Sequence, residues 1–408
     1  MSSPSPFSSR RRRLYKIDSL TVCNDVIYAL DCMSSRLLMF RTNHDDDNDE
    51  DSEEMKILDD ETLLNPEGLC VTRDSASVLV CDTGHHRIRC YFISANCKDS
   101  AVLAGFGTRG SLDGIGERAT FDSPTAVCQL GDTKGTIAVA DASRIRLLRA
   151  HTDGHIHVST ILFTADLSQQ LVLSRPVSIV ADEVGGGMII ADAGSRKVMC
   201  IRRSAPAGKP PRWTIRTCVG DGHPGNRDGS ASVARFERLR GMFAHKNGSL
   251  FVCDNDAIRY LKRAGDAFER VATLRCPWSG KPTDIAALSD GTLVVADQHR
   301  TGRVRRLRPA DIKMAVDAAL SFETSDTTVD NEEGDSFRIE IERMLSKTKK
   351  IDANAISRAL TDRGLTRVEA ELVVACLDGE TTLASTAATA ISNCVKEMGL
   401  DGKLSQSN

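Results

Sequence analysis

Aromatic side chains, long apolar runs and closely spaced cysteine pairs are scarce or missing in this 408-residue chain. Aromatic residues are 4% of the sequence although 41% of all residues are apolar, so the core must depend on Val, Ile, Leu and Ala. No run of about 18 apolar residues occurs, so no membrane-spanning helix is expected. A glycine-rich phosphate loop, a Ser-His-Asp order and a redox cysteine pair are also missing, which weighs against the enzyme classes that use them.

Cysteine is abundant, but its spacing does not indicate a disulfide scaffold. None of the thirteen cysteines forms a C-x-x-C motif. Cys70, Cys81, Cys200 and Cys253 lie inside apolar runs that are typical of strands. We expect them to be buried free thiols in a reducing compartment.

The N-terminal segment is basic and has no apolar stretch behind its arginines, which argues against a secretory signal. A disordered basic leader is therefore predicted over residues 1–13, in a cytoplasmic protein. The Ser/Arg-rich, acid-free composition of the first 17 residues leaves a mitochondrial presequence, and a mitochondrial location, as the alternative.

Charge is distributed unevenly along the chain, although the net charge is only −3. Residues 45–54 hold eight carboxylates and no base, so a disordered acidic loop is predicted over 43–54. Residues 311–408 have a net charge of −7, and residues 55–310 carry about +8. This basic region favours an anionic partner, with a solvated surface balanced by the chain's own acidic segments as the alternative.

One short pattern occurs six times: an apolar run, an aspartate, a few small or polar residues, a basic residue and a second apolar run. Steps of 43 to 62 residues separate the aspartates. Self-similarity at this spacing is typical of a repeat architecture, in which each unit is too small to bury its own apolar face. The aspartates are Asp31, Asp82, Asp141, Asp192, Asp254 and Asp297.

A single repeat, residues 66–103, divides into four short strands. The run at 78–81 is continuously apolar, as expected of a strand buried on both faces, and the run at 88–92 alternates like a half-exposed strand. The other two strands are expected at 68–72 and 100–105. Four antiparallel strands make one twisted sheet, and six such sheets predict a mainly β fold, a six-bladed β-propeller over residues 14–310.

Two motifs carry a family resemblance. The segment VCDTGHHRIR begins at the end of an apolar strand. Two long connectors contain Asp-Gly with a phenylalanine seven residues after the glycine: Phe121 after Asp113-Gly114, and Phe236 after Asp228-Gly229. The pattern resembles the NHL repeat, apart from His86 where asparagine is usual, and the resemblance covers residues 14–308. It implies a six-bladed propeller, in agreement with the six aspartates.

The repeated aspartates are expected to be structural. An aspartate at the end of a buried strand can accept backbone N–H bonds from the following loop and can pair with an arginine four or five residues on. A role in a binding site for one or two copies is the alternative.

The only histidine cluster is His151, His155 and His157. His155 and His157 lie two residues apart, so on a strand they face the same side, as metal ligands can. However, Asp153-Gly154 between two apolar runs is typical of a hairpin turn, which explains the segment without an ion. No metal and no cofactor is expected.

Enzymes with this fold, the propeller lyases and lactonases, need a set of acidic, Asn or His ligands around the central channel. The predicted inner strands offer only His245, Asp182 and Asp284, which do not form a recognisable set. The chain is therefore expected not to be an enzyme, with a metal-dependent lyase or lactonase as a further alternative.

The loops between second and third strands and the connectors between blades share one rim of a propeller, and here that rim is polar and basic. We expect it to bind a protein partner, as a non-enzymatic scaffold. Single-stranded RNA is the alternative partner, although aromatic stacking residues are missing from the rim. The predicted rim residues are His85, His86, Arg109, Arg118, Arg144, Arg196, Arg227, Arg235, His299 and Arg300.

The pattern changes after the last repeat. Residues 311–336 are predicted to be a linker, and residues 337–402 a helical module that binds partners or oligomerises. Thr366 and Glu369 form a capping box within it. The sequence leaves open which segment completes the sixth blade: residues 6–13 and 312–321 are both candidates, and the second has the pattern of a helix.

Overall fold

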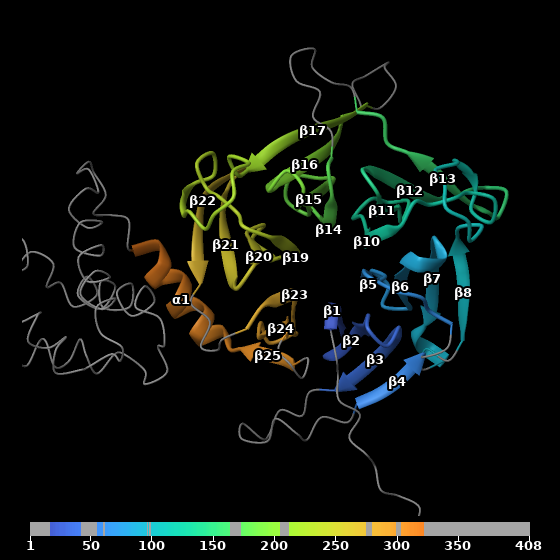
Figure 1. Ribbon diagram of the computed structural model, residues 1–408, viewed down its shortest axis with the longest axis horizontal. Helices are drawn as coiled ribbons and strands as arrows, with labels where there is room; N and C mark the ends of the chain where they lie inside the picture. The colour runs from blue at the N-terminus through green and yellow to red at the C-terminus, as the bar shows by residue number, and fades with distance from the viewer. Residues whose placement is uncertain are drawn as a thin grey trace, which may run out of the picture. The chain divides into compact units, whose positions relative to one another are not determined.

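The computed structural model describes residues 17–41, 55–59, 62–95, 97, 99–163, 173–204, 212–274, 280–298 and 303–321. These residues form six antiparallel sheets arranged as the blades of a ring (Figure 1). The predictions of a mainly β fold and of a six-bladed β-propeller are confirmed.

Within each blade the strands are paired in chain order, beginning with the strand nearest the axis. Blade 1 contains β1 (Ile17–Cys23), β2 (Val26–Asp31), β3 (Arg36–Arg41) and β4 (Met55–Asp59). Blade 2 contains β5 (Leu69–Val71), β6 (Ser77–Asp82), β7 (Arg87–Phe92) and β8 (Ser100–Ala104), with short 3-10 turns at Thr83–His85 and Ile93–Ala95. Blade 3 contains β10 (Pro124–Gln129), β11 (Ile137–Asp141), β12 (Arg144–Ala150) and β13 (Ile156–Thr160), with β9 (Gly114–Ile115) paired to β13.

Blades 4 to 6 follow the same scheme. Blade 4 contains β14 (Pro176–Ala181), β15 (Met188–Asp192), β16 (Lys197–Ser204) and β17 (Arg212–Val219). Blade 5 contains β19 (Leu239–Ala244), β20 (Leu250–Asp254), β21 (Ala257–Ala264) and β22 (Ala267–Leu274), with β18 (Gly229–Ser230) paired to β22. Blade 6 contains β23 (Pro282–Ala287), β24 (Leu293–Asp297) and β25 (Arg303–Leu307), and α1 (Pro309–Ser321) follows it.

The core lies between neighbouring blades. The second strands β6, β11, β15, β20 and β24 are buried along their whole length, because a neighbouring blade covers each of their faces. Between blades 3 and 4, for example, Ile145 and Leu147 belong to the same cluster as Ile190 and Met199. The apolar runs of the sequence are therefore continuous rather than alternating, as the buried position of these strands requires.

One of the expected free thiols is not free. Cys200 on β16 forms a disulfide with Cys218 on β17, with Cα atoms 6.0 Å apart. The register between these strands shifts so that Cys218 has no Cα partner on β16, and this bulge brings it beside Cys200. Cys70 and Cys81 are free thiols, Cys253 is buried, and burial raises the pKa of Cys70 to about 12.

Side-chain bonds, not a shared strand, close the ring in the part of the chain that the structure describes. The hydroxyl of Thr283 on β23 donates to the carbonyl of Ile17 on β1 (2.7 Å), just as Thr125 donates to Pro176 between blades 3 and 4. Closure therefore repeats an ordinary contact between neighbouring blades.

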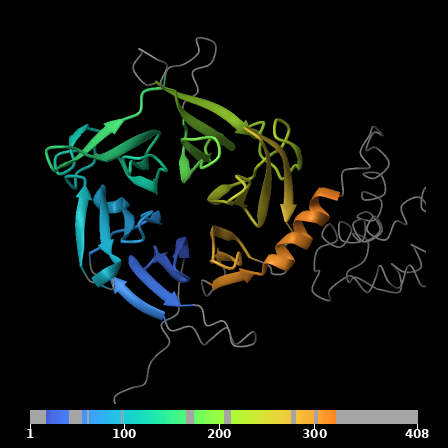
Figure 2. The same ribbon diagram turned by 180° about the vertical axis from the view of Figure 1, so that it is seen from behind.

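Further bonds join the first blade to the last. Asp284 accepts from the Ser19 hydroxyl and the Leu20 N–H, and Asp25 accepts twice from Ser289. Of the two candidate segments for a fourth strand of blade 6, residues 312–321 lie within α1, and residues 6–13 are outside the described residues. Helix α1 lies along the outer side of the ring beside β22 (Figures 1 and 2).

The chain divides into two compact units, Met1–Phe322 and Glu323–Asn408. The first holds the propeller and α1, which occupies the beginning of the predicted 311–336 linker. The predicted leader (1–13), acidic loop (43–54) and helical module (337–402) lie outside the described residues. No helix among the residues that can be described is long and apolar enough to cross a membrane.

Candidate functional site

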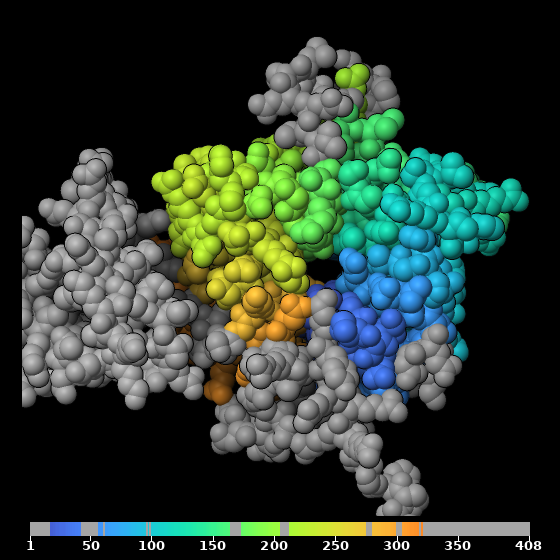
Figure 3. Space-filling view, in the orientation of Figure 1, coloured from blue at the N-terminus to red at the C-terminus, as the bar shows by residue number. Residues whose placement is uncertain are grey.

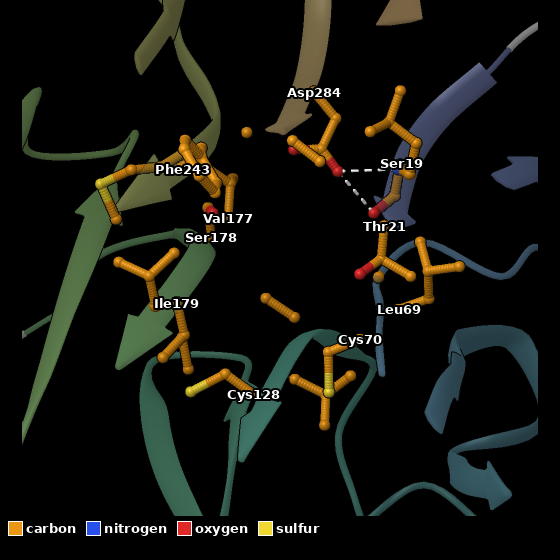
Figure 4. A pocket seen from close by; sticks show the side chains of 18 of the residues that line it. Ser19, Thr21, Leu69, Cys70, Cys128, Val177, Ser178, Ile179, Phe243 and Asp284 are labelled. Atoms are coloured by element: carbon orange, nitrogen blue, oxygen red, sulfur yellow. Dashed lines mark hydrogen bonds between the residues drawn. The ribbon is translucent and has the colours of Figure 1, made fainter. Parts of the chain in front are cut away.

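The first strands of the six blades line a central cavity of about 860 Å³. Figure 3 shows its opening in the middle of the ring, and Figure 4 shows the side chains that line it. The wall is largely apolar at mid-depth, where Leu69, Cys70, Cys128, Ile179 and Phe243 face the cavity. Ser19, Thr21 and Ser178 are polar lining residues within the inner strands, and Asp284 is a charged one.

Asp284 is a carboxylate of the cavity wall that lies within an inner strand, β23. Its bonds to Ser19 and Leu20, at 2.7 and 2.9 Å, run toward β1 (Figure 4). It also accepts from the Ile285 N–H at 2.9 Å. Burial outweighs these donors and raises the pKa of Asp284 to about 6. Gly241 on the neighbouring blade packs against it, and a side chain there would overlap Asp284. This carboxyl group thus bonds blade 6 to blade 1 and packs against Gly241 of blade 5.

Asp284 makes ring stability depend on pH. Its folded pKa, about 6, lies above the ordinary value of 3.8, so the folded protein binds an extra proton between these values. Its contribution is therefore fully present below about pH 4 and is lost as the pH rises through 6. Between pH 4 and pH 7 we expect the unfolding free energy of wild type to fall by about 3 kcal/mol more than that of Asp284→Asn, because one pKa unit corresponds to about 1.4 kcal/mol. A difference between wild type and variant that is constant with pH would contradict the assignment.

The three residues considered as channel ligands do not meet. Asp182 is in the turn between β14 and β15, where it makes two bonds to the buried guanidinium of Arg263, at 2.6 and 3.2 Å. His245 is exposed in the turn between β19 and β20. Only Asp284 lines the cavity, and the described lining contains no histidine. The three residues named from the sequence therefore do not form a ligand set in this wall.

One end of the cavity is an arginine cluster that sequence reasoning missed. Arg175 precedes β14, Arg238 precedes β19 and Arg240 is the second residue of β19, so all three lie where inner strands begin. The Nε of Arg240 is buried without a hydrogen-bond partner. Burial, with help from Arg238 and Arg175 and against the effect of Asp18, lowers the pKa of Arg240. A buried cation beside two others favours an anionic ligand at this end.

The opposite end of the cavity is spanned by an ion pair. Arg73, in the turn between β5 and β6, pairs with Glu183, in the turn between β14 and β15. The pair joins blades 2 and 4 across blade 3, where the Gln129 side chain accepts from the Arg73 N–H at 2.7 Å. The arginine-rich end is therefore the more suitable one for a ligand.

The six repeated aspartates are buried at the ends of the second strands. We expected their donors in the loop that follows, and Asp31 has one there, the Ser34 N–H at 3.3 Å. In the other five blades the backbone donor lies just before the first strand of the same blade. The chain re-enters each blade beside the end of its second strand, so these N–H groups are the nearest. The donors are Leu64 for Asp82, Asp122 for Asp141, Ser174 and Arg175 for Asp192, Arg238 for Asp254, and Lys281 for Asp297.

In three blades the aspartate also pairs with an arginine five residues on: Arg87, Arg146 and Arg259. Arg146 is fully buried and makes four bonds, to Asp141, Asp113 and the carbonyls of Leu112 and Thr120, at 2.8 to 2.9 Å. The matching Asp-Gly connector of blade 5 is held in the same way by Arg259. These arginines stack on the two connector phenylalanines, Phe121 and Phe236.

The predicted rim residues that the structure describes share one side of the ring, formed by the loops between second and third strands and the connectors between blades. We call this side the connector face. Several of them are already paired. Arg109 bonds Asp122 at 2.6 Å, Arg235 bonds Asp221 at 2.7 Å, His85 contacts Asp82, and His86 accepts from the Ser123 N–H. Arg118, Arg144 and Arg227 are exposed, and Arg196 is half-buried. His299 and Arg300 lie outside the described residues.

Sequence reasoning missed the apolar side chains of the connector face. Met33 lies between β2 and β3, Phe106 and Leu112 lie in the connector between blades 2 and 3, and Leu162 follows β13. Their exposed fractions are 71%, 67%, 67% and 81%. Large apolar and aromatic side chains beside arginine are typical of protein interfaces.

Comparison with solved structures places the fold among β-propellers. The chain is 11% identical to an auxiliary nutrient binding protein from Bacteroides thetaiotaomicron, with a TM-score of 0.53 over 72% of this chain and 69% of that one. It is 12% identical to an auxiliary nutrient binding protein from Bacteroides ovatus, with a TM-score of 0.52 over 72% and 70%. A gluconolactonase from Xanthomonas campestris is 12% identical, with a TM-score of 0.49 over 72% and 87%. At these identities the likeness concerns the fold alone.

The sequence comparison is more specific. Residues 63–91, which run from the connector before blade 2 to its third strand, match the family model of the NHL repeat. The chain thus carries an NHL repeat within a six-bladed β-propeller. No curated protein matches it.

Proposed function

We propose that the propeller is a non-enzymatic scaffold that binds a partner protein on its connector face. The observation that carries the proposal is the exposure of Met33, Phe106, Leu112 and Leu162 on the face that also exposes Arg118, Arg144 and Arg227. An acidic segment with one or more apolar side chains would complement both features, since apolar anchors supply affinity and charge supplies orientation.

The cavity agrees with binding rather than with metal-dependent catalysis. The channel ligands named from the sequence, Asp182, His245 and Asp284, do not meet there, and Asp284 is bonded to Ser19 and Leu20 at the ring closure. The arginine cluster of Arg175, Arg238 and Arg240 opens toward the connector face and would accept a carboxylate of the same partner segment.

Single-stranded RNA is the second candidate, and one observation favours it. Phe106 exposes an aromatic ring among the arginines of the connector face, and bases stack on such rings. RNA-binding surfaces usually present several stacking side chains along a strand, and the described part of this face exposes this one large ring. The protein partner is therefore the better-supported proposal.

Affinity capture with the immobilised full-length protein tests the two candidates. We expect Phe106→Asp combined with Arg118→Glu to reduce partner capture about 10-fold or more, because it removes an apolar anchor and reverses a nearby charge. Lys134→Glu, in the exposed turn between β10 and β11 on the opposite face, is the matched control and should capture normally. The captured proteins are identified and quantified by mass spectrometry. Capture is carried out at two salt concentrations, with and without nuclease.

The outcomes separate the candidates. Equal capture by wild type and both variants would overturn a role for the connector face. Capture that disappears with nuclease and falls steeply with salt would replace the protein partner by RNA.

A further inference from the structure

The hairpin between β12 and β13 brings two imidazoles and a carboxylate together. His151, Asp153 and His157 each offer one possible metal-ligand atom, and these three atoms lie within 4.8 Å of one another. Asp153 Oδ2 is 2.7 Å from His157 Nε2 and 3.6 Å from His151 Nδ1, and the two ring centroids are 4.7 Å apart. The spacing in the sequence predicts that His155 and His157 face the same side of a strand. In the structure, the hairpin places His151 beside His157 instead.

The backbone of the hairpin holds this arrangement in place. The His151 N–H donates to the His155 carbonyl at 2.9 Å, and Gly154 makes the turn at a φ of +82°. Asp153 Oδ1 accepts the His155 N–H at 2.9 Å, so the turn uses one carboxylate oxygen and leaves the other facing the imidazoles. His157 on β13 is paired with Arg149 of β12 on one side and with Ile115 of β9 on the other, so strands flank it on both sides.

We propose that His151, Asp153 and His157 bind one divalent transition-metal ion of the zinc type, independently of the connector face. Ligands at about 2.0 to 2.1 Å from a tetrahedral ion stand about 3.3 Å apart. The observed 2.7 and 3.6 Å lie on either side of that separation, and the two imidazole ligand atoms lie within 4.8 Å of each other, so side-chain rotations would bring all three ligands onto one ion.

The ligand types narrow the choice of ion. Imidazole nitrogens suit Zn²⁺, Ni²⁺ and Cu²⁺, whereas Ca²⁺ and Mg²⁺ prefer oxygen ligands alone. Three protein ligands leave one tetrahedral position for water or for a group from another molecule. The side chains are 60%, 40% and 37% exposed, in the order His151, Asp153 and His157, so an ion can enter directly from solvent.

Calorimetric titration of the full-length protein with ZnCl₂ tests the site. We expect His151→Ala and His157→Ala each to bind one equivalent less than wild type, or to weaken that equivalent about 10-fold or more. His155→Ala is the matched control, since it is in the same turn but outside the trio, and it should bind like wild type. Zinc bound by thiols elsewhere would be the same in wild type and in the three variants, so it would not affect the difference in zinc stoichiometry between them.

A second measurement guards against misfolded variants. All four proteins should melt at similar temperatures without metal, because the side chains are exposed, and Zn²⁺ should raise the melting temperature of wild type and His155→Ala above that of the other two. The same zinc stoichiometry and affinity in all four proteins, or a loss in His155→Ala equal to that in His151→Ala, would overturn the proposal and leave an ordinary His–Asp hydrogen bond.

Discussion

Arg259→Ala is expected to lower the free energy of unfolding by about 3–5 kcal/mol, since removing one member of a buried ion pair leaves its partner uncompensated. Arg259 is fully buried and bonds Asp254 at 3.0 Å, Asp228 at 2.7 Å and the carbonyls of Arg227 and Arg235 at 2.9 Å. Its loss leaves two carboxylates and two carbonyls without this donor and releases the Asp-Gly connector from blade 5.

Denaturant unfolding of Arg259→Ala measures this effect, and Lys262→Ala is the control on the same strand. Lys262 pairs with Glu269 at 3.3 Å on the surface, and such pairs contribute about 0–1 kcal/mol. Arg259→Lys should fall between the two, because an ammonium group cannot reproduce the planar fork of the guanidinium. Similar losses in Arg259→Ala and Lys262→Ala would show that the buried network adds nothing to stability.

Asp141→Ala is expected to have the second largest effect, a loss of about 3 kcal/mol or more. Asp141 is buried and accepts the Asp122 N–H at 2.6 Å and the Arg146 guanidinium at 2.9 Å. The substitution therefore leaves a backbone donor and a buried cation unsatisfied at the entrance to blade 3. Asp141→Asn keeps an oxygen acceptor but removes the charge, so its loss should be smaller.

Thermal unfolding, read together with partner capture, tests whether Asp141 acts in the scaffold or in a site. For a domain of this size each kcal/mol shifts the melting temperature by about 2–4 °C. Capture per folded molecule should remain unchanged. A normal melting temperature with lost capture would instead assign Asp141 to the binding site.

Strand positions could be predicted closely because they depend on local pattern. The runs expected at 78–81 and 88–92 lie within β6 and β7, and those expected at 68–72 and 100–105 contain β5 and β8. A strand covered on both faces must be apolar throughout, and that requirement is visible in the sequence of each repeat.

The site residues were harder to predict because they meet only across the ring. Arg175 and Arg240 are 65 positions apart and come from different blades, so no short motif connects them. The buried arginines had a weak signal, the second arginine of the R-I-R pattern at 144–146. That signal does not distinguish exposed Arg144 from buried Arg146, since the difference depends on which face the connector covers.

The sequence by itself determined the number of blades, the strands within them and the positions of the repeated aspartates, since these follow from period, apolar runs and turn residues within about 50 residues. The tertiary structure alone decided how the ring closes, which basic side chains are already paired, and which three groups of the His151–His157 hairpin converge. Each of these depends on distances between groups that a linear pattern does not contain, because burial and pairing arise only when the blades pack against one another.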